Sequence, residues 1–598
     1  MGLLQKAVET YDAHQDLVGV EREGHQMLAP IAHTVTGADI EITLDRHGCF
    51  RAARLLDKEE SKTVIPVTEE SAGRVGSKPV PHPLCDQLGY VSSLEPEKKA
   101  AYLEQLSAWK ESPYSHPIPE AVYAYVSQGT ILDDLQKAGI STEKNKQLIR
   151  WRINGIFPEV EECWKNTSLF IKYTQWYLEK KDAEEKELCI ISGRFAPLAA
   201  SHPKSVVPIH GNAKIISSND TSNFTYRGRF LNDGQAASIG FEASQKAHNA
   251  LRWLVAEQGV QVVFGKRTFL CWNPQGTEIH HPARPFRKRA TVSKKPSDYR
   301  EQLMETLLSY KSNLPEQTAG VVIAAFDAAT SGRLAVTYYN ELMASDFLQR
   351  LHDWDEHCCW WYWDKGADCR AIRSPALLQI VNCAFGTQRE EKGVVKLVTD
   401  DKVLRQQMQR LIACRVDSSP FPSDIERLLV ERASNPQSYD SGVHSQILNT
   451  ACAVIKKYYY DRKKEELSMA LEKERKDRSY QFGRLLAVYE KVDRDTFSET
   501  ESREPNAIRL QSAFCRQPMH MAAEIEKQLE RAYFPRLSVG TRKYYKMLIS
   551  QIMEIISSTD EKQLNAPLGD TYLLGYYLQR NALYTKKTTE KTEEEENA

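Results

Sequence analysis

Two arginines that alternate with aromatic residues are the side chains of this chain best suited to hold an anion. In the stretch 223–230 (NFTYRGRF), an extended strand would place Phe224 and Tyr226 on one face and Arg227 and Arg229 on the other. Guanidinium groups bind phosphate or carboxylate oxygens through paired N–H donors. Taken alone, the stretch fits an edge strand with surface ion pairs better, so anion binding depends on what the rest of the chain offers.

A glycine-containing loop offers a second set of donors. Gly73 and Gly76 let backbone N–H groups approach an acceptor closely, and Arg74 and Lys78 add positive charge. Ser71 precedes them with a hydroxyl group. The loop is therefore a candidate phosphate site, and a surface turn without a ligand is an equal interpretation of it.

A third basic segment covers residues 280–295. Its prolines discourage regular structure, and its cations could lie along a phosphate backbone. The dense Arg/Lys run together with Phe286 favours nucleic-acid binding. A solvated linker is the alternative. The cations of this segment are Arg284, Arg287, Lys288, Arg289, Lys294 and Lys295.

Enzyme motifs are scarce. The chain has no GxSxG elbow and no HExxH helix, and Gly259 to Lys266 misses the spacing of a phosphate loop. The pair His352-Asp353 supports an alternative function, a metal-dependent nuclease or phosphohydrolase, but further ligands are not evident. The nearby Cys358 and Cys359 lie among tryptophans, which favours a buried aromatic cluster. We therefore predict no catalytic residue, no metal and no cofactor.

Composition limits the class of protein. A chain of 598 residues requires about two to four hydrophobic cores, and its net charge of −1 means that nucleic-acid binding must come from local patches. No run of about eighteen apolar residues occurs, which predicts no membrane span. The twelve cysteines form no CxxC pair, which argues against disulfides and common zinc frameworks. We expect a cytoplasmic protein.

The order of patterns predicts an α+β protein. An N-terminal α/β region is expected at 1–220, a central α/β region with the basic loop at 221–400, a helical bundle at 401–584 and a disordered tail at 585–598. A helical stretch is expected from about Pro96 to Lys181. The predicted hairpins join Ala38–Leu44 to Cys49–Leu56, Val260–Phe264 to Thr268–Trp272, and Val321–Phe326 to Leu334–Tyr339.

Helices are predicted from periodicity and end signals. Phe241–Gln258 carries an apolar face and stops at Gly259. Ser423 and Glu426 form a capping box that would open a helix over Ile425–Ala433. The antiparallel C-terminal bundle is expected from helices near Val443–Glu474, Tyr480–Val492, His520–Tyr533, Thr541–Ser557 and Thr571–Tyr584.

These segments, in this order, resemble the large subunit of the type I-C CRISPR Cascade surveillance complex. The likeness spans nearly the whole chain, and the ordered combination is more specific than any single motif. It is carried by Leu3-Leu4-Gln5 to Tyr11-Asp12, Ile65–Ser71, His82–Asp86, Asn223–Phe230, Ser244–Leu251 and Leu573–Arg580.

The resemblance implies a non-catalytic, prokaryotic subunit. It would recognise the protospacer-adjacent motif in double-stranded DNA, help to open the duplex, hold the displaced strand and recruit a helicase-nuclease. Its other partners would be crRNA, the backbone subunits and a small subunit. Assigning Ser71, Gly73, Arg74 and Lys78 to motif recognition is our inference. The cations at 227–229 and 284–295 then become candidate contacts to the DNA backbone.

The resemblance also implies that a small subunit can be translated from an internal start. Met469 follows Lys463–Glu466, whose codons can form a purine-rich ribosome-binding sequence. Residues 469–598 would then form a separate helical bundle. A chance methionine after a solvated Lys/Glu run is the alternative.

Overall fold

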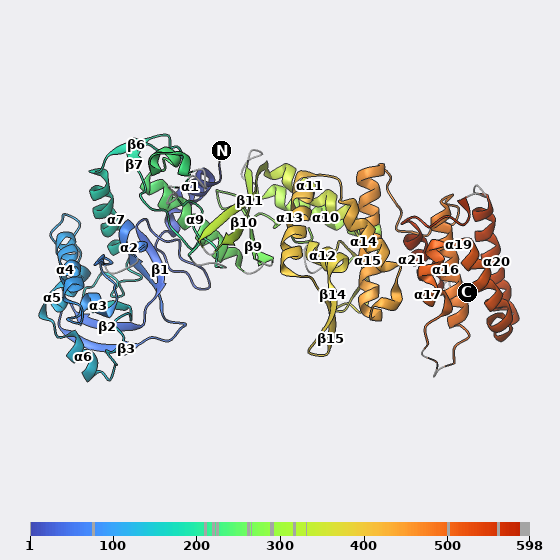
Figure 1. The fold of residues 1–598 in the computed structure, drawn as a ribbon, viewed down its shortest axis with the longest axis horizontal. Coiled ribbons are helices and arrows are strands. Elements are labelled where there is room, and N and C mark those ends of the chain that lie inside the picture. Colours follow the sequence, from blue (N-terminus) through green and yellow to red (C-terminus); the bar gives the residue numbers. More distant parts are fainter. Residues whose placement is uncertain are drawn as a thin grey trace, which may run out of the picture. The chain divides into compact units, whose positions relative to one another are not determined.

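The chain divides into two compact units. The computed structural model describes residues 2–74, 78–208, 212–217, 222, 227–259, 263–264, 266–286, 292–314, 319–330, 332–498, 501, 503–558 and 563–585 (Figure 1). One unit comprises Met1–Ile279 with Ala319–Leu342, and the other comprises His280–Thr318 with Met343–Ala598. Both contain helices and small sheets, which confirms the α+β class. The division into three regions and a tail stays a prediction.

The first unit combines small sheets with helices. Its helices are α1 (Leu3–Ala13), α2 (Glu69–Ala72), α3 (Leu88–Val91), α4 (Pro96–Lys110), α5 (Pro117–Gln128), α6 (Ile131–Lys137), α7 (Thr167–Asp182), α8 (Asp233–Ala236) and α9 (Phe241–Gln258). Its strands are β1 (His33–Gly37), β2 (Ile40–Asp45), β3 (Phe50–Leu55), β4 (Lys62–Pro66), β5 (Ile149–Asn154), β6 (Lys186–Leu188), β7 (Phe195–Pro197), β8 (Val263–Phe264), β9 (Arg267–Trp272), β10 (Gly320–Thr330) and β11 (Arg333–Met343).

All three predicted hairpins form, with one unexpected addition. The β2–β3 turn is closed by Asp45, whose Oδ1 accepts the backbone N–H of Cys49 at 3.0 Å, and by Gly48 at φ +79°. Strand β5 pairs in parallel with β2, so the expectation of helix throughout 96–181 is wrong there. The alternation of apolar Trp151 and Ile153 with polar Arg152 and Asn154 is the strand signal that was missed.

Helix α9 is the central helix of the first unit. It has the predicted bounds and ends at Gly259, whose φ of +63° favours glycine. It packs against α1, and Asn249 on α9 donates hydrogen bonds at 3.1 Å to the carbonyls of both Ala29 and Pro30. Strands β8, β9, β10 and β11 form one antiparallel sheet beside it.

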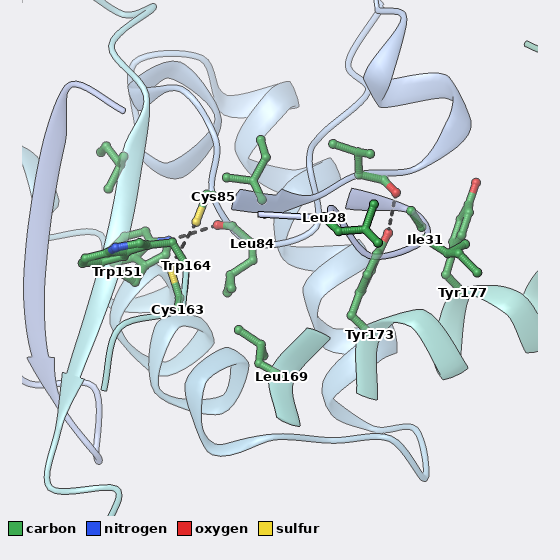
Figure 2. Packing of buried hydrophobic residues seen from close by; sticks show 14 of the residues in the cluster. Leu28, Ile31, Leu84, Cys85, Trp151, Cys163, Trp164, Leu169, Tyr173 and Tyr177 are labelled. Carbon is green, nitrogen blue, oxygen red and sulfur yellow. Dashed lines mark hydrogen bonds between the residues drawn. The ribbon is translucent and has the colours of Figure 1, made fainter. Parts of the chain in front are cut away.

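A core of aromatic residues fixes the chain just after β4. Tyr173 on α7 donates to the carbonyl of Val67 at 2.9 Å, and the hydroxyl of Tyr177 accepts the N–H of Glu69 at 2.8 Å. In the same core, Trp151 donates to the carbonyl of Leu84 at 3.0 Å (Figure 2). The segment that leads into Ser71 is therefore held from its buried side.

The second unit is mostly helical. Its helices are α10 (Pro296–Ser312), α11 (Ala344–His357), α12 (Leu377–Phe385), α13 (Asp401–Asp417), α14 (Ser423–Ala433), α15 (Ser441–Lys463), α16 (Arg478–Arg494), α17 (Asn506–Arg509), α18 (Gln511–Arg516), α19 (Pro518–Gln528), α20 (Val539–Ser557) and α21 (Tyr572–Tyr584). Its two hairpins are β12 (Trp360–Asp364) with β13 (Cys369–Arg373), and β14 (Thr387–Glu391) with β15 (Val394–Val398).

The C-terminal helices pack around α16, which is buried along most of its length. Two glycines allow α16 and α21 to meet: a Cβ at Gly483 would lie 1.9 Å from the carbonyl oxygen of Tyr572, and one at Gly575 would lie 2.0 Å from that of Tyr480. Helix α15 ends at Lys463 rather than near 474, because Lys464 adopts φ +57°.

Two further observations concern helices. The predicted capping box is wrong, since Ser423 is already the first residue of α14, Pro422 occupies the N-cap, and no side chain caps this helix. Across the ranges that the structure describes, no helix combines the length and apolar character needed to cross a membrane.

Candidate nucleic-acid interface

The first unit contains a cavity of about 840 Å³. Its walls come from β1, from the end of β4 through Arg74, from the segment 201–206 and from one side of α9. The predicted loop residues Ser71, Gly73 and Arg74 line it. The structure thus brings part of one sequence-predicted site into a concave space.

Ser71 and Arg74 are both committed to the protein scaffold. The N–H of Ser71 donates to Thr68 Oγ1 at 3.0 Å, and the Ser71 hydroxyl lies 2.9 Å from His82 Nδ1. Arg74 donates hydrogen bonds from both terminal nitrogens to the buried carboxylate of Asp86, and its guanidinium group lies over the ring of Tyr90. Their role in DNA binding stays a prediction, and their observed role is to shape the cavity wall.

Gly73 and Lys78 differ from these two residues because they are exposed. The backbone N–H of Gly73 donates to the carbonyl of Glu70 at 3.3 Å, whereas the side chain of Lys78 forms no hydrogen bond or ion pair within the described part of the chain. Gly73 follows α2, with no atom within 4 Å of where a Cβ would stand. These two positions are the accessible part of the predicted loop site.

A second group of cations lines the cavity, and the sequence did not reveal it. Lys204 and Lys214 face each other in an antiparallel bridge, which places their side chains on the same side, about 5 Å apart at Cβ. Arg252 on α9 donates through Nε to the carbonyl of Lys204 at 3.1 Å. These two contacts hold three positive side chains together.

Their charges are not neutralised locally. In the ranges that the structure describes, no carboxylate forms an ion pair with Lys204, Lys214 or Arg252. Burial lowers the pKa of Lys214, and the charge of Lys204 lowers it further. Burial also lowers the pKa of Arg252 to about 10. The three basic side chains give the cavity wall an excess of positive charge that a bound anion would offset.

Charge in the rest of the cavity does not cancel this excess. Of its acidic residues, Glu69 is paired with Lys181 at 2.8 Å, and Asp39 accepts the N–H of Leu148 at 2.7 Å. Lys146 adds a further exposed cation. Only the periodicity of α9, which puts Arg252 on the same face as Gln245, could have suggested this group from sequence.

The prediction that Arg227 and Arg229 lie on a strand is wrong. Arg227–Arg229 form a turn of 3₁₀ helix, so the alternating faces expected of a strand do not exist at these residues. Phe224 and Tyr226 lie outside the described residues. Arg229 is exposed, which keeps it available as a backbone contact.

The basic segment at 280–295 is anchored in the second unit. Arg415 donates to the carbonyls of Pro282 at 2.7 Å and Arg284 at 2.6 Å, and its buried partner Asp355 accepts the N–H of Phe286. Phe286 is fully buried and stacks on Tyr310, so its ring belongs to the core and does not support nucleic-acid binding by this segment.

The cations of this segment that the structure describes are exposed, in contrast to Phe286. Arg284, Lys294 and Lys295 are exposed, and Lys295 is the N-cap of α10. Arg287, Lys288 and Arg289 lie outside the described residues. Burial of Phe286 fixes the point from which the segment leaves the core, and its contact with DNA stays a prediction.

The His352-Asp353 pair on α11 lies close to a third possible metal ligand, Glu356. His352 Nδ1 lies 3.2 Å from Asp353 Oδ1 and 3.9 Å from Glu356 Oε2, and these three residues could hold a metal ion. Glu356 is also paired with Arg300 at 3.2 Å. Burial raises the pKa of Cys359, whose thiol accepts from Lys456 at 3.4 Å. The carboxylates and the thiol thus have protein partners already.

Met469 lies between two helices. It follows α15 and precedes α16, is nearly buried, and its sulfur lies 3.7 Å from that of Cys359. A chain that begins at Met469 would contain α16 through α21 without interrupting any of them. Whether it is a start site stays a prediction.

Comparison with known proteins decides the family. The chain matches the family described as CRISPR-associated protein (Cas_Csd1) over residues 8–584. The chain belongs to this family. It is a CRISPR-associated large subunit of the type I-C Cascade, as the ordered segments of its sequence indicated. None of the curated proteins compared with this Cas_Csd1 chain matches it.

Proposed function

We propose that this Cas_Csd1 chain recognises the protospacer-adjacent motif in double-stranded DNA as a non-catalytic subunit. In this proposal it also aids duplex opening, stabilises the R-loop and recruits a helicase-nuclease. The observation that carries the proposal is the group of Lys204, Lys214 and Arg252 at the cavity wall, for which the described residues offer no carboxylate ion-pair partner. Such cations attract phosphate and give binding that weakens with salt.

The division of labour follows from the chemistry of guided recognition. Base pairing with crRNA reads the target, so the protein needs only to bind the backbone and a short motif. The exposed Gly73 lines the cavity, and the exposed Lys78 and Arg229 supply further cations on the same unit. Backbone contacts position DNA without reading its sequence, so the motif must be read by groups that reach base edges.

The test uses the complex assembled with guide RNA. Arg74 is unsuited to it because Arg74→Glu would leave Asp86 buried without a partner, so the variant carries Lys78→Glu with Arg229→Glu. It should assemble normally while losing about tenfold or more in affinity for target duplex, with a shallower salt dependence. The matched control is Lys137→Glu, a 76% exposed side chain on α6 away from the cavity. Unchanged, salt-sensitive affinity in the double variant would remove these two assignments.

A further inference from the structure

The cavity is too small to enclose a duplex, although its cations can attract the phosphates of one, and it has the right size for a nucleotide. Its volume of about 840 Å³ lies within the range of roughly 300–1,000 Å³ that is usual for small-ligand sites. A duplex is convex and keeps its bases stacked, so proteins read it by inserting elements into its grooves. A concave space of this size instead receives a nucleotide that has left the stack.

One wall of the cavity is suited to a phosphate. Lys204 and Lys214 project from directly opposed backbone positions, and Lys214 Nζ is held by Ser201 Oγ at 2.8 Å. Arg252 is positioned by Asn249, whose Oδ1 accepts Nη1 at 3.2 Å. A phosphate placed here would exchange the mutual repulsion of the two lysines for attraction.

The adjoining wall is suited to the edge of a base. Gln245 lies one turn before Asn249 on α9, lines the cavity and is only 8% exposed. Its amide makes no hydrogen bond to any residue that the structure describes. The amide atoms remain accessible from the cavity, so one N–H donor and one carbonyl acceptor are available together to a base edge. Val35 and Val206 supply apolar surface nearby.

We propose that this cavity binds one unpaired nucleotide of a DNA strand, with its phosphate against Lys204 and Lys214 and its base edge against Gln245. The proposal rests on the proposed function, because it assumes that the bound nucleic acid is DNA. It adds that the large subunit holds an extruded nucleotide in a preformed site, so that DNA with a base already unpaired binds more tightly than intact duplex.

The test compares three fluorescent probes with the purified full-length chain: a short matched duplex, the same duplex with one bulged nucleotide, and the bulge replaced by an abasic site. The wild type should prefer the bulged duplex about tenfold or more over the other two. The double variant Lys204→Gln with Lys214→Gln should lose that preference. Gln245→Leu should bind the bulged and abasic probes equally.

Matched controls come from α6, where Gln136 and Lys137 are exposed and lie outside the cavity. Gln136→Leu and Lys137→Gln should keep the preference of the wild type, and melting temperatures should show that every variant is folded. Equal preference in the wild type and the Lys204/Lys214 variant would overturn the proposal, as would a wild type without preference or tighter binding of a bulged RNA.

The two proposals fail differently. If the assembled complex still binds target duplex according to its motif while the bulged probe shows no preference, only the nucleotide site is wrong. If the complex binds no DNA at all, the proposed function is wrong as well.

Discussion

Arg74 and Asp86 form a bidentate ion pair, with guanidinium nitrogens 2.8 and 2.5 Å from the two carboxylate oxygens. Asp86 is fully buried, and its oxygens also accept the N–H groups of His82 and Gln87 at 2.7 Å each. The pair therefore closes the loop on which the predicted motif-reading residues lie. Its arginine has a structural task whether or not it also contacts DNA.

Removing the arginine should destabilise the first unit. Arg74→Ala leaves a buried carboxylate without its charge partner, which typically costs about 3–5 kcal/mol. Urea unfolding followed by tryptophan fluorescence measures this, with Lys78→Ala as the exposed control. A change in the free energy of unfolding below about 1 kcal/mol, together with lost DNA binding, would instead assign Arg74 directly to the ligand.

The contact between α16 and α21 should not tolerate a methyl group. Gly483→Ala and Gly575→Ala each place Cβ about 2 Å from a backbone carbonyl oxygen, so the helices must separate, at a cost of about 1–3 kcal/mol or more. Gly540→Ala on α20 is the matched control: nothing lies within 4 Å of its Cβ, and alanine should stabilise that helix slightly. If the melting temperature of Gly483→Ala were as high as that of Gly540→Ala, this close packing of α16 and α21 would be contradicted.

The second unit should lose stability as pH rises. Burial and the neighbouring carboxyl of Asp570 together raise the pKa of Glu426 to about 8. Because this pKa is above its ordinary value of 4.5, the stabilising effect is complete below about pH 4.5 and is lost as pH rises toward and through 8. The hydroxyl of Tyr459 on α15 donates a hydrogen bond to the carboxylate of Asp570 at 2.6 Å, so this helix contacts the acidic neighbour of Glu426.

Glu426→Gln keeps the shape and removes the titration. Its unfolding midpoint should vary less with pH between about 5 and 8 than that of the wild type, and the variant should be the more stable of the two at pH 8. Parallel pH profiles for the two proteins would show that Glu426 is not the titrating group.

An internal start at Met469 should be visible without changing the protein. Silent substitutions in the codons of Lys463–Glu466 would weaken a ribosome-binding sequence and leave the full-length chain intact. A C-terminal tag should then report loss of a short product by immunoblot. Persistence of that product would assign it to proteolysis.

The cluster on α11 separates the two functional hypotheses. If the subunit is non-catalytic, His352→Ala should leave target binding unchanged, and wild-type complex should leave DNA intact with added Mn²⁺. Metal-dependent cleavage by the wild type that disappears in His352→Ala would favour the nuclease alternative. Gln349→Ala, which removes hydrogen bonds to Asp353 and Lys311 and leaves His352 in place, controls for local packing.

Periodicity and turn chemistry predicted the elements that depend on local sequence. The bounds of α9 and the β2–β3 turn at Asp45 and Gly48 follow from such signals. Strand β5 was missed because its pairing with β2 lies more than a hundred residues away in sequence. Long-range pairing leaves little local trace beyond alternation.

The residues of the candidate site were also predicted only where they are close together in sequence. Arg74 and Lys78 were found because they share a loop, whereas Lys204, Lys214 and Arg252 meet only through tertiary structure. Sequence also cannot tell a cation that has a buried partner from one that lacks it. That distinction separates Arg74 from Lys214 and redirects the site toward the cavity.

The most direct test of the central claim is a gel shift of the guide-loaded complex against matched duplexes that differ only in the trinucleotide flanking the target. Recognition by the large subunit predicts tight binding for one or a few trinucleotides. It also predicts that the Lys78→Glu/Arg229→Glu variant binds all of them more weakly by a similar factor. Equal binding of every trinucleotide by the wild-type complex would contradict the account.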